Sequence, residues 1–340
     1  MILVIGAGAV GSFLGWTLAS GGEEVQLLRR RGPTETRPEA LSVAGPGAPA
    51  AMVQINVLGS VEGVMSSPEI VLIAVKMPDL PGAIDTAAAW PEATVLAVEN
   101  GVGADELLTN ARPGGGLIAG SLTTSVERAD DGSIRRLSRG GIVLAPVQGE
   151  VRGAVECLLA AFIAGGLRAR ETTNPAAMRW SKLLINLLGN ASGAIVDLDP
   201  VAVFRDRDLF GLERRQLDEA LATMAGLGLH PIRLYGADTR LLPIAAHLPG
   251  PLVQPILSRV VGGGRGGKRP SLHLHLDGGS GPTEVAWLNG AVARAAARLG
   301  RQAPVNACLA ELVEACNQDP ERRAWFRGRP DRLLETIAAG

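Results

Sequence analysis

The sequence predicts an α/β protein, with an N-terminal Rossmann-type, doubly wound parallel sheet followed by a C-terminal all-α domain. Short apolar runs alternate with helical patterns through the first half, whereas no strong strand pattern follows about residue 172. The two domains are therefore expected over residues 1–172 and 173–340. Just beyond that boundary, Asn174 and Pro175 suit the cap and the first turn of a helix.

Four continuous apolar runs in the first half are predicted strands. They cover residues 2–5, 25–28, 70–75 and 94–98. Because the runs lack polar alternation, they are typical of parallel strands that are covered on both faces. Residues 9–20 are predicted to form a helix between the first two strands, with Val10, Phe13, Leu14 and Leu18 on one face.

The second half shows mainly helical periodicity. Helices are expected over residues 175–193, 208–228, 251–262, 283–299 and 306–316. We interpret the segment Gly262–Gly267 as a flexible loop. A phosphate-binding nest is the less favoured alternative, because no strand precedes the segment. His273 and His275 alternate in a strand-like run, and we expect them to serve packing or a loop.

Composition and charge restrict the class of protein. The 340 residues are 46% hydrophobic and 20% charged, with a formal net charge of -1, which is ordinary for a two-domain globular chain. A neutral balance provides no attraction to nucleic acid or to an anionic membrane.

The apolar N-terminus lacks the basic start of a signal peptide, and no stretch resembles a membrane span, so a cytoplasmic protein is expected. Cys157, Cys308 and Cys316 lack the spacing of a metal site, and we expect no metal.

A glycine-rich motif follows the first predicted strand and opens the first predicted helix. It consists of Gly6, Ala7, Gly8, Ala9, Val10 and Gly11. In a dinucleotide site the first glycine allows the tight turn, the second lets the pyrophosphate approach the backbone, and the third lets helix and strand pack closely. The helix N-terminus also offers free N–H groups to the phosphates. A glycine turn without a ligand is the less favoured alternative.

Three arginines follow the second predicted strand. An acidic residue at this position would bind the ribose hydroxyls of NAD, whereas a basic residue suits the 2′-phosphate of NADP. The sequence therefore favours NADP(H), with Arg30 as the first candidate and Arg29 and Arg31 as helpers. The alternative is a basic turn that is simply solvated.

Two later strand ends are expected to face the same cofactor, because ligands gather at the carboxyl ends of parallel strands. Lys76 follows the third predicted strand, and Asn100 follows the fourth. Each could also be an ordinary loop residue. Their positions at successive strand ends beside the glycine motif favour a role in binding.

Polar residues on an apolar helix suggest the chemical site. Lys182, Asn186 and Asn190 are spaced by four, so we expect one polar stripe along the helix. An exposed stripe of an amphipathic helix is the alternative, although asparagine forms helices poorly. Glu284 is expected in the first turn of a later helix, where the helix dipole alone could explain a negative charge.

At these residues the sequence resembles the ketopantoate reductase (2-dehydropantoate 2-reductase) family, and the resemblance covers nearly the whole chain. The matching segments are Gly6–Gly11, Val75–Lys76, Glu99–Gly101, Arg179–Lys182 with Asn186 and Asn190, Pro270–Ser271, Thr283–Glu284, Leu288–Gly290 and Pro304–Asn306. Their order and spacing together are far more specific than any single segment.

The resemblance implies a role for each matching residue. Lys182 would donate a proton to the ketone oxygen, and Glu284 would orient the lysine and contact the cofactor. Asn186, Asn190 and Ser271 would bind the substrate, the last through its carboxylate.

It also implies three further cofactor contacts. Asn100 would touch both substrate and nicotinamide, Lys76 would contact the cofactor, and Val126 would do so through its backbone.

The implied reaction is NADPH-dependent reduction of a small-molecule 2-keto acid to a 2-hydroxy acid, with 2-dehydropantoate as the first substrate to try. We expect the substrate in a cleft between an NADP-binding domain and a helical catalytic domain. The sequence departs from the family pattern between Ser271 and Glu284, so other 2-keto acids stay open. An opine-type or 3-hydroxy acid dehydrogenase and a non-catalytic NADPH-binding regulator are the alternatives. A homodimer is possible, as the commonest oligomer.

Overall fold

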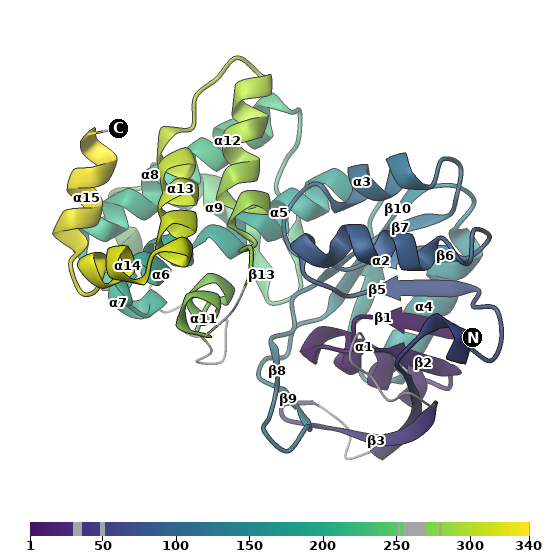
Figure 1. The fold of residues 1–340 in the computed structure, drawn as a ribbon. Coiled ribbons are helices and arrows are strands. Elements are labelled where there is room, and N and C mark those ends of the chain that lie inside the picture. Colours follow the sequence, from purple (N-terminus) through teal and green to yellow (C-terminus); the bar gives the residue numbers. More distant parts are fainter. Residues whose placement is uncertain are drawn as a thin grey trace. The chain divides into compact units, whose positions relative to one another are not determined.

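The computed structural model of the chain describes residues 1–29, 36–47, 52–250, 252–254, 257, 269–278 and 281–339. These residues form two compact units (Figure 1). Unit 1 contains residues 1–99 and 103–178, and unit 2 contains residues 100–102 and 179–340. The expected residues Arg30, Arg31 and Gly262–Gly267 lie outside the described residues, as does most of the expected helix over 251–262.

Unit 1 is built on one sheet in the order β11-β10-β7-β6-β5-β1-β2-β4-β3-β9-β8. Its strands are Ile2–Ile5 (β1), Val25–Leu28 (β2), Arg37–Ala44 (β3), Met52–Leu58 (β4), Ile70–Ile73 (β5), Thr94–Ala97 (β6), Leu117–Leu122 (β7), Val126–Arg128 (β8), Ile134–Arg136 (β9), Ile142–Gln148 (β10) and Ala169–Glu171 (β11). From β7 to β4 all neighbouring strands are parallel. The predicted Rossmann-type parallel sheet is therefore confirmed.

Four helices of unit 1 pack on this sheet. They are Ala9–Ser20 (α1), Leu80–Ala87 (α2), Ala104–Ala111 (α3) and Arg152–Ala164 (α4), and short 3-10 turns cover Val61–Gly63 (η1) and Met77–Asp79 (η2). α1 packs against α4, and α2 against α3. Because the chain leaves β1 in both directions and parallel crossovers are right-handed, the two pairs cover opposite faces, as in a doubly wound sheet.

The sheet continues past β4 into strands that the sequence pattern did not predict. β3 and β4 form an antiparallel pair, as do β8 and β9, and β9 joins β3. α1 contacts β3, β4, β8 and β9 as well as β2, so this part of the sheet curls around the helix that the glycine motif begins. The curl brings β3 and β8 close to the carboxyl end of β2.

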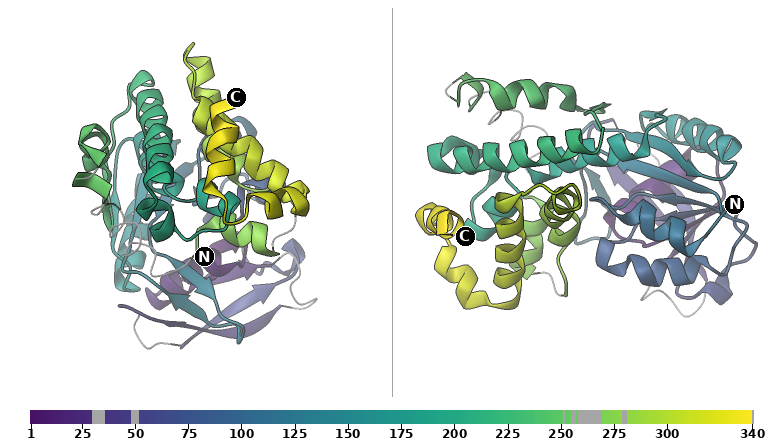
Figure 2. Two further views of the ribbon diagram at one scale, coloured as in Figure 1. Left: turned by 90° about the vertical axis from the view of Figure 1, so that its left-hand side faces the viewer. Right: turned by 90° about the horizontal axis from the view of Figure 1, so that it is seen from above.

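Unit 2 is helical, as predicted, and its helices run from teal to yellow in Figures 1 and 2. They are Pro175–Leu187 (α5, whose first turn belongs to unit 1), Ala191–Val196 (α6), Pro200–Arg205 (α7), Arg207–Gly226 (α8), Leu242–His247 (α9), Ser271–Gly278 (α11), Asn289–Arg298 (α12), Pro304–Gln318 (α13), Pro320–Phe326 (α14) and Pro330–Ala339 (α15). Short elements are Arg233–Leu234 (β12), Ala237–Asp238 (β13), Thr239–Leu241 (η3) and Val285–Trp287 (η4). α12 and α13 lie side by side over a core of buried hydrophobic residues.

The predicted cap of α5 is confirmed, but its predicted length is wrong. Asn174 accepts a hydrogen bond from the Ala177 N–H at 2.8 Å, and the helix begins at Pro175. It ends at Leu187 rather than at residue 193, because Gly189 adopts a left-handed backbone with φ of +60°. Asn190 therefore lies beyond α5, at the N-cap position of α6, although its side chain makes no capping hydrogen bond.

Two further expectations in unit 2 need correction. His273 and His275 lie in the helix α11 rather than in a strand-like run, and both are buried. Glu284 does not lie in the first turn of a long helix. It precedes the 3-10 turn η4, and the following helix α12 begins only at Asn289. None of the described helices is long and apolar enough to cross a membrane.

Candidate functional site

The glycine motif connects β1 to α1 in the geometry of a dinucleotide turn. Gly6 has φ of +100°, and a Cβ on it would lie 2.7 Å from the Ala74 carbonyl oxygen. A Cβ on Gly11 would lie 1.9 Å from the Gly6 carbonyl oxygen. Gly8 is exposed, and a Cβ on it would meet no atom of the described residues within 4 Å. The protein's own packing thus requires Gly6 and Gly11, whereas the space at Gly8 is open to a ligand, which fits the pyrophosphate of a dinucleotide.

The end of β2 presents one described arginine, Arg29. Its guanidinium donates to both carboxylate oxygens of Glu39 on β3, with Nη2–Oε2 at 2.9 Å and Nη1–Oε1 at 3.3 Å. Arg37 also reaches Oε1 of Glu39 at 3.3 Å. Burial alone would raise the pKa of Glu39, but the hydrogen bonds and charges of these two arginines outweigh it and lower the pKa. Glu39 is therefore a carboxylate at neutral pH.

Arg128 joins this region from β8. Its Nη2 donates to the carbonyl oxygen of Ala7 at 3.0 Å and to Oγ of Ser12 at 2.5 Å, so it connects the glycine turn with the first turn of α1. Partial burial lowers the pKa of Arg128, and the positive charge of Arg29 lowers it further. The group lines a cavity that we call the arginine hollow, with Arg29, Arg37, Glu39, Ser42, Arg128 and Ser133 among its lining residues.

The remaining cofactor candidates of unit 1 lie at strand ends. Lys76 is exposed just before η2, two residues after the Ala74 that packs against the glycine turn. Val126 is buried at the start of β8, the strand that carries Arg128. Lys76 thus follows the carboxyl end of the parallel strand β5, whereas Val126 begins a strand that pairs antiparallel with β9, and the cofactor contacts of both residues stay predictions.

Asn100 belongs with unit 2 rather than with the strand it follows. The segment Asn100–Val102 groups with unit 2, where the Val102 N–H donates to the Trp287 carbonyl oxygen at 3.1 Å. Nδ2 of Asn186 on α5 donates to Oδ1 of Asn100 at 3.4 Å. Trp287 in turn donates its N–H to the Glu284 carbonyl oxygen at 3.0 Å. The candidate residues Asn100, Asn186 and Glu284 thus lie on segments that are connected by hydrogen bonds.

A second chain of contacts connects Asn190 and the start of α11. Nδ2 of Asn190 donates to the Asn186 carbonyl oxygen at 2.9 Å, and Oδ1 accepts from the Leu272 N–H at 3.2 Å. This places Ser271, which is exposed, on the segment held by Asn190. Lys182 lies one helical turn before Asn186 and is partly exposed, so the two share a face of α5. The structure therefore brings the unit 2 candidates into one neighbourhood despite the break after Leu187.

Glu213, which the sequence did not single out, supports the break between α5 and α6. It lies on α8, is 1% exposed, and accepts hydrogen bonds from the Gly189 N–H at 2.7 Å, from Oγ of Ser192 and from Nε2 of Gln216. These bonds fix the turn that carries Asn190. A carboxylate buried with several donors is a structural requirement of this turn.

Replacing Glu213 with alanine is expected to lower the free energy of unfolding by about 2–4 kcal/mol, since each buried donor left without an acceptor costs about 1–3 kcal/mol. Urea denaturation measures the loss. As a control, alanine at Arg215, which is exposed on the same helix, is expected to change stability by less than about 0.5 kcal/mol. Equal stability of the two variants would contradict the role of Glu213.

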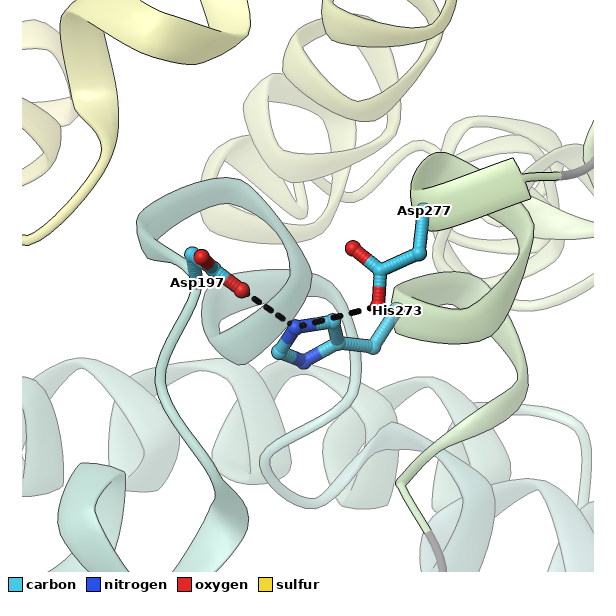
Figure 3. A group of neighbouring side chains, drawn as sticks. All are labelled: Asp197, His273 and Asp277. Carbon is cyan, nitrogen blue, oxygen red and sulfur yellow. Dashed lines mark hydrogen bonds and ion pairs between the residues drawn. The ribbon is translucent and has the colours of Figure 1, made fainter.

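Three side chains of unit 2, Asp197, His273 and Asp277, lie close enough to share a cation (Figure 3). Nε2 of His273 is 2.7 Å from Oδ1 of Asp197. Arginines surround the two carboxylates: Arg327 contacts Asp197 at 2.5 Å, Arg323 contacts Asp277 at 2.6 Å, and Arg269 contacts both at 3.4 and 3.0 Å. Three guanidinium groups already neutralise these carboxylates, so we interpret the cluster as an ion-pair network that ties α11 to α6 and α14.

The residues that sequence reasoning missed are Glu39, Arg128 and Glu213. Glu39 and Arg128 lie in strands of mixed polarity, where a charged residue is typical of a solvated face. Glu213 lies in a helix with several other charges, and only its burial distinguishes it. No local sequence pattern could have identified Glu39 and Arg128, because β3 pairs with the hairpin of β8 and β9, which is distant in the sequence.

Comparisons with known proteins connect both units to one family. The family model described as ketopantoate reductase PanE/ApbA matches residues 2–149, and the model of its C-terminal part matches residues 174–317. A curated relative, 2-dehydropantoate 2-reductase from Halobacterium salinarum, is 26% identical over 321 residues, which cover 94% of this chain and 99% of the relative.

Solved structures share the fold over nearly the whole chain. A PanE/ApbA family ketopantoate reductase from Ralstonia eutropha JMP134 has a TM-score of 0.76 at 24% identity, covering 95% of this chain and 100% of that one. A D-mandelate dehydrogenase solved with NADH and anilino(oxo)acetate has a TM-score of 0.73 at 18% identity, with coverage of 96% and 99%. A ketopantoate reductase from Staphylococcus aureus, described as dimeric, has a TM-score of 0.70 at 18% identity, with coverage of 93% and 98%.

Proposed function

Because the chain belongs to the ketopantoate reductase family PanE/ApbA, we propose that it reduces a 2-keto acid to a 2-hydroxy acid with NADPH, with 2-dehydropantoate as its substrate and pantoate as the product. The observation that carries the proposal is the grouping of Asn100, Asn186 and Asn190 on hydrogen-bonded segments, with Lys182 on the same face of α5 as Asn186. A cation and an amide on one face of a helix suit a substrate that carries a carbonyl and a carboxylate.

We propose that unit 1 is the cofactor-binding domain. The motif Gly6–Gly11 would hold the pyrophosphate, because Gly8 leaves its approach open and α1 offers N-terminal N–H groups. Arg30 and Arg29 after β2 would bind the 2′-phosphate, and Lys76 and Val126 would make further contacts. When bound, the nicotinamide supplies the hydride for C2 of the keto acid.

Lys182 in unit 2 is the proposed general acid. Negative charge develops on the carbonyl oxygen as C2 is reduced, and a protonated ammonium group beside that oxygen stabilises the charge and then donates its proton. Glu284 is proposed to orient Lys182 and to contact the cofactor. Asn100 would contact both substrate and cofactor. The substrate's remaining polar groups would be bound by Asn186, Asn190 and Ser271, the last through the carboxylate.

The proposal is tested by following the loss of reduced-nicotinamide absorbance with a panel of keto acids, each with NADPH and with NADH. The panel contains 2-dehydropantoate, phenylglyoxylate, pyruvate and 2-oxoglutarate, with and without an amino acid as the amine donor. We expect turnover with 2-dehydropantoate and NADPH to have the highest kcat/KM. Amine-dependent turnover would instead support an opine-type dehydrogenase. Tight cofactor binding without turnover of any acid would support a non-catalytic regulator.

Replacing Arg29 with alanine is expected to weaken NADPH binding by about 10-fold or more while leaving NADH binding unchanged, because a charge-assisted hydrogen bond to the 2′-phosphate is worth about 1.5–3 kcal/mol. Isothermal titration with each dinucleotide measures the two affinities. The matched control is Arg152→Ala, which removes an exposed arginine paired with Glu156 on α4. Equal weakening of NADPH and NADH would show that Arg29 does not read the phosphate.

We further propose a homodimer, the commonest closed oligomer of soluble proteins. The description of a Staphylococcus aureus relative as dimeric supports it. Sedimentation at several protein concentrations would test it, with a concentration-independent monomer as the contrary result.

A further inference from the structure

The lining of the arginine hollow includes the carboxylate of Glu39, which the proposed function does not use. Glu39 accepts the fork of Arg29 in a bidentate arrangement and a third contact from Arg37. Two parallel N–H···O bonds from one guanidinium are the geometry in which arginine also binds a phosphate. The Glu39 carboxylate therefore holds the donors of Arg29 in the way a bound phosphate would.

The charges around Glu39 do not balance. Arg29, Arg37 and Arg128 contribute three positive charges to the lining of the hollow, whereas Glu39 and Asp131 contribute two negative ones. Asp131 directs its carboxylate to the N–H and hydroxyl of its neighbour Ser133, at 2.9 and 2.6 Å. Arg128, whose positive charge interacts with both Arg29 and Glu39, binds the backbone of the glycine turn. Among its described lining residues, the hollow thus has one positive charge in excess after Glu39 and Asp131 are counted.

The contact between Arg29 and Glu39 is accessible to an incoming anion. The side chain of Arg29 is 29% exposed and that of Glu39 is 22% exposed, so water reaches both partners. Water that reaches both groups screens their attraction in part, and a phosphate dianion offers Arg29 the same bidentate geometry. An incoming dianion can therefore replace the carboxylate, and the carboxylate resists it by competition and by repulsion.

We propose that Glu39 is a specificity residue that occupies the phosphate position of the arginine hollow when no cofactor is bound, and that it lowers the affinity for 2′-phosphorylated dinucleotides without affecting their unphosphorylated counterparts. The inference rests on the proposed binding of a dinucleotide by unit 1. It assigns to β3 a control over the preference between NADPH and NADH, in addition to the arginines that follow β2. Removing the negative charge of Glu39 then strengthens the preference for NADPH.

The test is Glu39→Gln in the full-length protein, with direct titration of NADPH, NADH, adenosine 2′,5′-bisphosphate and adenosine 5′-phosphate. Glutamine keeps the size of the side chain and removes its charge. We expect the two ligands with a 2′-phosphate to bind about fivefold more tightly, the scale of a partly exposed ion pair, and the other two to change less than about twofold. Glu156→Gln on α4 removes a carboxylate paired with Arg152 and controls for the net-charge change; it is expected to change none of the four affinities.

A double variant separates competition from a general change of charge. If Glu39 acts by occupying Arg29, the effect of Glu39→Gln on NADPH binding is expected to be largely lost when Arg29 is already alanine. Weaker binding of NADPH to Glu39→Gln, or an equal change for NADPH and NADH, would overturn the inference. Failure of the wild-type protein to bind either dinucleotide would instead overturn the proposed function, so the two failures can be told apart.

Discussion

Replacing Lys182 with alanine is expected to lower kcat by about 10²–10⁴-fold, the range that a positioned general acid contributes. The dissociation constant of NADPH is expected to stay nearly unchanged, because we propose that Lys182 contacts the carbonyl oxygen of the substrate, whereas the glycine turn and the arginine hollow of unit 1 bind the phosphates. Steady-state kinetics with 2-dehydropantoate and titration of NADPH measure the two quantities separately. Partial exposure of Lys182 in the structure favours a folded variant.

Lys76→Ala is the matched comparison for Lys182→Ala. Lys76 is exposed and belongs to unit 1, where we propose that it contacts the cofactor. Its removal is expected to raise the KM for NADPH and to leave kcat largely intact. Undiminished kcat in Lys182→Ala would remove the proposed acid, and a loss that appears only in the KM for NADPH would assign the lysine to the cofactor instead.

The sequence predicted four strands of the parallel part of the sheet, because their apolar runs are continuous, but it missed the buried strand β7, whose run is interrupted by Gly120 and Ser121. The predicted strands over residues 2–5 and 25–28 have the observed bounds of β1 and β2, and the predicted helix over residues 9–20 has those of α1. β3 and β4 have partly exposed faces, so their sequences lack a continuous apolar run. They are strands because they pair with β2 and with each other, which a local pattern does not contain.

The errors in unit 2 have local causes. Lys182, Asn186 and Asn190 kept the spacing of a helix, which does not reveal that the helix stops between the last two, and only Gly189 signals the stop. The alternation of His273 and His275 resembled a strand. In the structure Nε2 of His273 lies against Asp197 and Nε2 of His275 against the Gly281 carbonyl oxygen, so each ring is held by a group outside α11.

The sequence predicted candidate site residues where the residue type and its position together suggest a specific role. Glycines at a strand–helix turn and a lysine among amides predicted where binding and chemistry are now proposed. Arg128 and Glu39 were not predictable, because their significance depends on how β8 and β3 curl around α1. The role of a charged residue in a strand can be inferred only when the neighbouring strands and their side chains are known.

Gly8→Ala and Gly11→Ala are expected to separate cofactor binding from folding. Gly8 has φ of -74° and ψ of -169°, an extended backbone that alanine adopts, and its Cβ would meet no described atom within 4 Å. The variant is therefore expected to fold with a free energy of unfolding within about 0.5 kcal/mol of the wild type. Its methyl group would occupy the space proposed for the pyrophosphate, so binding of NADPH and NADH is expected to be lost together.

Gly11→Ala is expected to impair folding itself, before cofactor binding can be measured. Its Cβ would lie 1.9 Å from the Gly6 carbonyl oxygen, so α1 must move away from the turn that follows β1. Overpacking of this kind costs about 1–3 kcal/mol and sometimes more, and here both atoms belong to rigid backbone. Urea denaturation of both variants, together with NADPH titration of the folded fraction, distinguishes them. If Gly8→Ala bound NADPH as tightly as the wild type, the open space at the turn would not be where the pyrophosphate binds, and the assignment of unit 1 as the cofactor domain would lose its main structural support.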